Sequence, residues 1–263
     1  MKLSIIIVSV VLIIPLPILG QSDEQKKVEA ALAERESRAL TAAERVSVAD
    51  DWARAAQRFQ KEKARLWDRA VVCYERAWTD LDELGRNKLR AAALRAAAIP
   101  DDLARYRKGS ASPLGWEAFS ETAGSCIEEK AVFSGQRCGK MVRWTKENKA
   151  GNSWLTSLRF KVQLGKEYKF SARVFSDRAD APALLQLRFY DAAGDVLVQV
   201  GPTVDGDFPF WKRIEGVGKA PDGAVWADVC FWSRLTVGFF LIDDVSALTD
   251  GKEVITNGNF EKK

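Results

Sequence analysis

Residues 185–190 have the sequence LQLRFY, in which apolar side chains alternate with side chains that carry a polar group. This period of two is typical of a β-strand that turns one face to a core and the other outward. The alternation recurs in residues 158–162 (LRFKV) and 168–174 (YKFSARV), and Gly- and Asp-containing turns separate these segments. Short strands joined by regular turns predict an antiparallel β-sandwich or jelly roll, which we assign to residues 114–263.

The segment before this sandwich, residues 22–108, has the sequence pattern of helices. Ala, Glu, Arg, Lys and Leu dominate it, and no Gly or Pro occurs between Gln21 and Leu84. Apolar residues recur there at helical spacing, so we expect an α+β multidomain chain. The small residues 109–113 (GSASP) predict a linker between the two parts.

Part of the helical segment resembles one tetratricopeptide-like hairpin. The residues that fit this pattern are Trp52, Ala56 and Phe59 in a first helix and Ala70, Tyr74 and Ala77 in a second. The resemblance implies a surface to which a protein partner could bind. Tetratricopeptide solenoids generally need three or more repeats, so an ordinary helical bundle is the alternative.

The N-terminal residues 1–20 predict a secretory signal peptide. Lys2 supplies a positive charge, residues 3–19 are almost all aliphatic, and Gly20 is a small residue at which a signal peptidase could cleave. We therefore expect a secreted, periplasmic or cell-envelope protein with no membrane span after cleavage. The alternative is an uncleaved anchor, although the run is short for a span and contains two prolines.

Composition excludes several kinds of chemistry. The chain has no histidine, which rules out a His-dependent triad, a His general base and His metal ligands. The four cysteines show no CxxC spacing, which argues against a zinc site. In an exported protein Cys126 and Cys138 could form a disulfide, or they could remain thiols. The net charge of +4 is small, so we expect no nucleic-acid partner.

Six motifs in the sandwich region resemble, in their order, those of galactose-binding-like jelly rolls that include xylan- and glucan-binding carbohydrate-binding modules. They are Gly115-Trp116, SGQRC at 134–138, LGKEYKFSA at 164–172, LRFYDAAG at 187–194, the segment 211–224 and IDDVS at 242–246. The resemblance implies the jelly-roll fold and, less specifically, carbohydrate binding. This fold also serves as a structural or protein-binding appendage in other proteins.

One further motif stands in an unusual place. Such modules usually begin with a strand reading N-G-[GD]-F-E, whereas here NGNFE occupies residues 257–261 and nothing like it precedes Trp116. One interpretation is circular permutation, in which the C-terminal segment supplies the missing strand. The other is the truncated remnant of a second module. Permutation is slightly favoured, because the apolar strand end would otherwise be unpaired.

The period of two also indicates which residues of the predicted strands face outward, away from the core. Opposite the apolar faces, aromatic rings are combined with charged groups. Sugars bind by stacking their C–H faces on rings and by hydrogen bonding to Arg and Asp. The predicted ligand-binding residues are Arg173, Arg188, Tyr190, Trp226, Asp228 and Trp232. The alternative is that this face packs against the helical segment, which has tryptophans of its own.

The resemblance also implies a structural Ca2+ ion. The matching ligands would be Asp243 or Asp244 in the closing strand and Glu261 in the NGNFE motif. Hard oxygen ligands of this kind suit Ca2+. The alternative is that Asp243 and Asp244 form a solvated strand end.

Two functions are consistent with these features. The first is a secreted, non-catalytic, lectin-like protein that binds a polysaccharide or glycan through the outward face. The second is an envelope adaptor, in which the helical segment binds a protein partner and the jelly roll is structural. An enzyme is not expected, because neither region shows a pair of carboxylates suited to glycoside hydrolysis.

Overall fold

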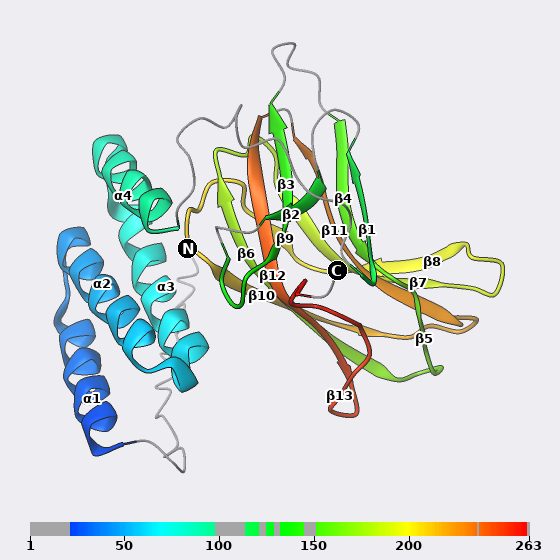
Figure 1. Cartoon of the computed structure of the whole chain (residues 1–263), viewed down its shortest axis with the longest axis horizontal. Helices are drawn as coiled ribbons and strands as arrows, with labels where there is room; N and C mark the ends of the chain where they lie inside the picture. Colours follow the sequence, from blue (N-terminus) through cyan, green and yellow to red (C-terminus); the bar gives the residue numbers. More distant parts are fainter. Residues whose placement is uncertain are drawn as a thin grey trace, which may run out of the picture. The chain divides into compact units, whose positions relative to one another are not determined.

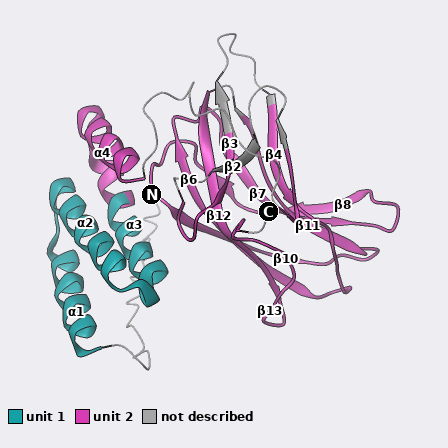
Figure 2. Cartoon of the chain, in the orientation of Figure 1, with its two compact units in different colours: residues 1–74 teal, residues 75–263 magenta. Residues whose placement is uncertain are grey.

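The computed structural model describes residues 22–97, 114–120, 125–128, 132–144, 151–235 and 237–261. The predicted signal peptide and the predicted linker lie outside these residues. The chain divides into two compact units, residues 1–74 and 75–263 (Figure 2). This division falls inside a helix, earlier in the chain than the linker at 109–113. In the described part of the chain, no helix is both long enough and apolar enough to cross a membrane.

Unit 1 is helical, as the sequence predicts. It contains α1 (Asp23–Arg38), α2 (Ala42–Arg58), η1 (Gln60–Glu62) and the first part of α3 (Lys63–Asp80). At the start of α2, the Thr41 side chain accepts from the Glu44 N–H and the Glu44 carboxylate accepts from the Thr41 N–H. This capping box satisfies amide groups that would otherwise lack partners. The tetratricopeptide-like arrangement itself stays a prediction.

The core of unit 1 is formed by residues that the helical spacing selects. They include Val48, Trp52, Ala55, Ala56, Leu66, Ala70 and Tyr74, each 5% exposed or less. Tyr74 also donates a hydrogen bond to Asp50 at 2.6 Å. Burial raises the pKa of Tyr74, and the hydrogen bond to Asp50 adds to this effect, so its hydroxyl stays protonated.

Unit 2 contains α4 (Glu83–Ala96) and two antiparallel sheets that form a β-sandwich (Figure 1). In the described residues, the seven-stranded sheet has the order β1 (Trp116–Ser120), β4 (Gly151–Ser157), β11 (Trp226–Leu235), β7 (Ala183–Tyr190) and β8 (Val196–Val200), with β5 (Phe160–Lys161) on β11 and β9 (Thr203–Val204) on β7. The six-stranded sheet has the order β10 (Lys212–Lys219), β6 (Glu167–Asp177), β12 (Val237–Thr249), β3 (Cys138–Trp144) and β2 (Ser125–Glu128), with β13 (Lys252–Glu253) on β12. The predicted β-sandwich of the jelly-roll class is confirmed.

The two sheets enclose one apolar core, and the predicted inward faces are correct. From the seven-stranded sheet come Leu185, Leu187, Phe189, Ala227, Val229 and Phe231; from the six-stranded sheet come Tyr168, Phe170, Ala172 and Val174. Strict alternation works here because each sheet has one face on this core and the other outside it. The pairing of β2 with β3 sets Cys126 opposite Lys140 and Cys138 opposite Glu128, so these cysteines are not direct cross-strand partners.

The C-terminal NGNFE motif is part of the sandwich. Phe260 is fully buried and its ring centroid lies 4.8 Å from that of Trp116. The Trp116 indole donates to the Asn257 carbonyl at 3.0 Å, and the Val245 N–H donates to the Gly258 carbonyl at 2.9 Å. A Cβ at Gly258 would lie 1.7 Å from the Val245 carbonyl oxygen, so only glycine fits. The segment forms turns rather than a strand, but its packing beside Trp116 favours the permuted arrangement.

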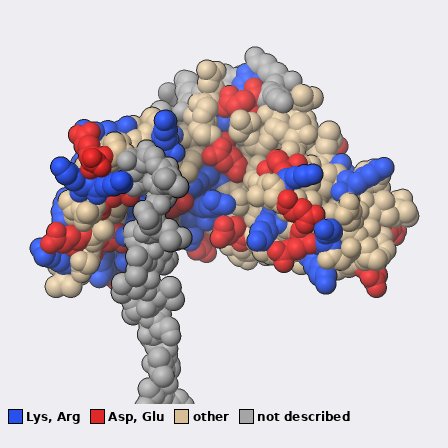
Figure 3. Space-filling model, turned by 90° about the horizontal axis from the view of Figure 1, so that it is seen from below, with Lys and Arg blue, Asp and Glu red and all other residues tan. Residues whose placement is uncertain are grey.

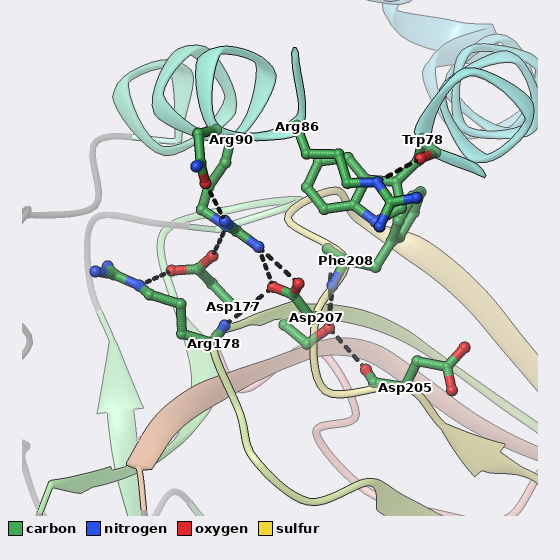
Figure 4. Close-up of polar contacts among 10 residues, drawn as sticks. Trp78, Arg86, Arg90, Asp177, Arg178, Asp205, Asp207 and Phe208 are labelled. Atoms are coloured by element: carbon green, nitrogen blue, oxygen red, sulfur yellow. Dashed lines mark hydrogen bonds and ion pairs between the residues drawn. The ribbon is translucent and has the colours of Figure 1, made fainter. Parts of the chain in front are cut away.

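Arg90 on α4 ties this helix to the sandwich (Figure 4). Its Nε lies 2.9 Å from Asp177 Oδ1, and its Nη2 donates to both oxygens of Asp207 at 2.5 and 2.6 Å. The contact with Asp177 is an ion pair without hydrogen-bond alignment. The Arg90 guanidinium also lies 5.4 Å from the ring of Trp78, which meets Phe208 edge-on at 6.2 Å. Helix α4 is therefore part of the same compact unit as the two sheets.

Candidate functional site

Five of the six predicted ligand-binding residues lie together on the outward face of the seven-stranded sheet. Tyr190 on β7 pairs with Trp226 on β11, and Arg188 pairs with Asp228. Trp232 lies further along β11. We call this surface, formed by outward residues of β1, β4, β5, β11, β7 and β8, the outer face.

Arg173, the sixth predicted residue, lies elsewhere. It is on β6 of the six-stranded sheet and only 3% exposed, with its guanidinium 4.6 Å from the ring centroid of Phe133. The period of two tells which residues of one strand share a face, but it does not tell which sheet the strand joins. Arg173 is therefore not part of the outer face.

The strand register arranges the outer face in four rows. They are Trp154–Trp232–Leu184, Glu117–Thr156–Cys230–Gln186, Asp228–Arg188–Gln199 and Lys161–Trp226–Tyr190. Aromatic residues thus lie in the first and last rows, and polar groups dominate the two rows between. At about 3.3 Å per residue, the six-residue step from Trp226 to Trp232 spans about 20 Å. Trp154, Trp226 and Trp232 are each partly exposed.

Asp228 is the buried centre of the polar rows. Its Oδ1 accepts from Arg188 Nε at 2.8 Å, and its Oδ2 accepts from Arg188 Nη2 at 2.9 Å and from the Tyr190 hydroxyl at 2.8 Å. The side chain of Asp228 is 3% exposed and that of Arg188 is 23% exposed. Asp228 therefore fixes its two neighbours, and Arg188 is the member of the group that a ligand can reach.

Burial and the contact with Asp228 keep Arg188 and Tyr190 each in a single protonation state. Burial works against the Arg188 charge, but the hydrogen bond to Asp228 outweighs it and raises the pKa of Arg188. Burial, together with the adjacent Asp228 charge, also raises the pKa of Tyr190. Tyr190 therefore stays neutral and Arg188 stays charged at any physiological pH.

Trp154 and Thr156 on β4 belong to the outer face, although the sequence did not single them out. Thr156 Oγ1 lies 3.4 Å from Cys230 Sγ and 3.5 Å from Arg188 Nη2. Leu155 between them is fully buried in the core. The alternation of residues 153–157, SWLTS, was the available signal, but this stretch is too short to predict a strand without its pairing partner.

The three residues that the resemblance assigns to calcium are held by a loop of the chain itself. Asp243 Oδ2 accepts from the N–H groups of Phe133 and Ser134, at 3.1 and 2.9 Å. Asp244 Oδ1 accepts from the Ser134 hydroxyl at 2.6 Å. Glu261 Oε1 accepts from the N–H groups of Gln136 and Arg137, at 2.7 and 2.9 Å.

These three carboxylates each accept hydrogen bonds from donors of the loop. Among the described residues, no group of three or more His, Cys, Asp or Glu residues is placed to hold a metal ion. Burial, together with the adjacent Asp244 charge, raises the pKa of Asp243 to about 8, although two loop amides and the Asp244 N–H partly offset this effect. Calcium binding at these residues stays a prediction.

Several helical residues of unit 2 contact residues that are not part of the outer face. Trp78 contacts Phe208, Arg90 contacts Asp177 and Asp207, and Lys212 forms an ion pair with Glu75. A cavity of about 660 Å3 lies at this contact and is lined by none of the predicted ligand-binding residues. On the face of unit 2 that Figure 3 shows, acidic and basic side chains are interspersed.

No protein-family model and no curated protein matches this sequence. Solved structures similar to it include a carbohydrate-binding module, TmCBM61, in complex with β-1,4-galactotriose, with 13% identity over 53% of this chain and 91% of that chain at a TM-score of 0.37. Another is the CBM22-1 xylan-binding domain of Paenibacillus barcinonensis Xyn10C, with 16% identity over 54% and 90% at a TM-score of 0.37.

A third similar structure is the enzymatically active domain of the bacteriophage CBA120 tailspike protein 4. Its identity is 14% and its TM-score 0.44, and the match covers 52% of this chain but 19% of that one. This chain therefore matches about a fifth of the length of the tailspike domain. These likenesses concern the sandwich, and the function proposed below depends on the chain's own residues.

Proposed function

We propose that this protein is a non-catalytic carbohydrate-binding protein that holds an oligosaccharide along β11 on the outer face. The observation that carries the proposal is the order of the four rows, with aromatic residues about 20 Å apart and fixed polar groups between them. That length suits several linked sugars better than a single one.

The chemistry of the rows suits sugars. The C–H faces of a sugar ring stack on aromatic side chains, while its hydroxyls need directed donors and acceptors. Trp154 and Trp232 are cross-strand neighbours and supply one stacking platform. Gln186 and Arg188, both partly exposed, supply amide and guanidinium groups between the platforms. Because Asp228 holds Arg188 in place, little side-chain entropy is lost when a ligand binds.

The same rows support binding without catalysis. Glycoside hydrolysis uses two carboxyl groups, one as acid and the other as base or nucleophile. Of the two carboxylates in the rows, Asp228 is buried and both of its oxygens accept hydrogen bonds. Glu117 is then left without a catalytic partner.

Export is part of the proposal. Residues 1–20 have the layout of a signal peptide, which supports a secreted or periplasmic location where extracellular polysaccharides are found. N-terminal sequencing of the protein from its own cells is expected to begin at or near Gln21.

The test of binding is affinity electrophoresis of the full chain in gels that contain xylan, β-glucan, galactan or galactomannan. We expect retardation by at least one of them, and loss of that retardation in Trp232→Ala. Arg213→Ala, an exposed change on the six-stranded sheet, is the matched control and is expected to migrate as wild type does. Equal migration of wild type in all gels and in a polysaccharide-free gel would contradict the proposal.

A further inference from the structure

We infer that the Tyr190–Trp226 end of the outer face recognises an anionic group of the glycan, a carboxylate or a sulfate. The inference rests on the proposed function and names the substrate class for the same face. It starts from two basic residues, Arg159 and Lys161, which are not among the predicted ligand-binding residues. Arg159 lies between β4 and β5, and Lys161 lies on β5.

Both cations lie over aromatic rings of the last row. The guanidinium carbon of Arg159 is 3.8 Å from the centroid of the Tyr190 ring. The Lys161 ammonium is 5.6 Å from the Trp226 ring, and the two residues are paired in register. These cation–π contacts hold the charges at one end of the outer face. Since Arg159 covers Tyr190, a ligand arriving there meets a guanidinium group instead of a bare ring.

Neither of these two cations belongs to an ion pair within the described part of the chain. Arg188, by contrast, is neutralised by Asp228. The neighbouring Asp191 has its Oδ1 engaged by the N–H groups of Gly194 and Asp195, at 2.8 and 2.9 Å. Both cations are exposed to solvent. This end of the outer face therefore presents two positive charges to a ligand.

Such an end favours an anionic sugar over a neutral one. A guanidinium group can donate two parallel hydrogen bonds to a carboxylate or a sulfate, and the lysine adds a second charge. A neutral hydroxyl would accept only one of these hydrogen bonds and would gain no electrostatic attraction from either cation. We expect a preference of roughly tenfold for the anionic ligand at low ionic strength, which falls as added salt screens the exposed charges.

The experiment compares matched ligands that differ in charge. Polygalacturonate is paired with its fully methyl-esterified form, and dextran sulfate with dextran, and the full chain is titrated with each at low and at high salt. The variants are Arg159→Gln and Lys161→Gln, alone and together. Arg213→Gln removes an exposed positive charge from the six-stranded sheet and controls for the net charge of the protein. A preference within the polygalacturonate pair would indicate recognition of a carboxylate, and a preference within the dextran pair would indicate recognition of a sulfate.

The expected result is tighter binding of an anionic ligand than of its neutral partner, with the preference lost in the double variant and kept in Arg213→Gln. Equal affinity for both members of each pair would overturn the inference and leave the proposed function standing. A preference that survives in the double variant, or disappears equally in Arg213→Gln, would also overturn it. If neither these ligands nor the neutral polysaccharides bind, the inference and the proposed function fail together.

Discussion

Asp228 holds Arg188 in a two-pronged ion pair on the outer face, with both nitrogen–oxygen distances under 3 Å (2.8 and 2.9 Å). Replacing Asp228 by Asn would leave a guanidinium that is mostly buried without its counter-charge. We expect Asp228→Asn to lower the free energy of unfolding by about 2–3 kcal/mol, as measured by urea denaturation.

A surface ion pair provides the control for this change. Arg213 and Glu215 lie 3.4 Å apart on the six-stranded sheet, with side chains 52% and 71% exposed. Solvent screens such a pair, so Glu215→Gln is expected to change stability by less than about 0.5 kcal/mol. Equal effects of the two substitutions would mean that Asp228 has no special part in ordering the outer face.

The buried ring of Phe260 is expected to stabilise the whole sandwich. Because it is 0% exposed and packs on Trp116, Phe260→Ala should cost about 3–5 kcal/mol and lower the melting temperature clearly. Leu248→Ala on β12 is the control, since Leu248 is 36% exposed. A Phe260→Ala protein with the same melting temperature as wild type would show that the NGNFE segment does not complete the sandwich.

Arg90 is expected to keep α4 on the sandwich. Arg90→Ala removes a side chain that is 18% exposed and leaves the fully buried Asp177 with Arg178 as its remaining cation. We expect faster amide hydrogen exchange throughout α4 and a loss of about 2 kcal/mol in stability. Arg95→Ala, at an exposed position in the last turn of α4, is the control. Unchanged hydrogen exchange in Arg90→Ala would mean that apolar contacts, such as that of Trp78 with Phe208, are sufficient to keep α4 on the sandwich.

Local patterns predicted the elements of this fold well. The alternation in residues 185–190 identified both faces of β7, because each sheet faces the core with one side only. Helical spacing and strong helix formers likewise identified the buried face of α2, including Trp52 and Ala56. These features depend on neighbours along the chain, so the sequence displays them directly.

Contacts between distant segments could not be read in the same way. Arg173 and Arg188 have the same place in the period of two, yet they belong to different sheets. The bond from Trp116 to Asn257 joins residues 141 apart, and that from Arg90 to Asp207 joins residues 117 apart. Trp154 became part of the candidate site only through its register with Trp232. Strand pairing and the packing of distant segments, which no local pattern encodes, decide these relationships.

The most direct measurement is a calorimetric titration of the full chain with an oligosaccharide from the polysaccharide that retards it, repeated with Trp154→Ala and Trp232→Ala. Each of these rings is partly exposed, so both variants should unfold near the wild-type temperature. Loss of a stacking platform should weaken binding by about 2 kcal/mol, or roughly 30-fold, in each variant. Two folded variants that bind as tightly as wild type would contradict the assignment of the glycan to the outer face.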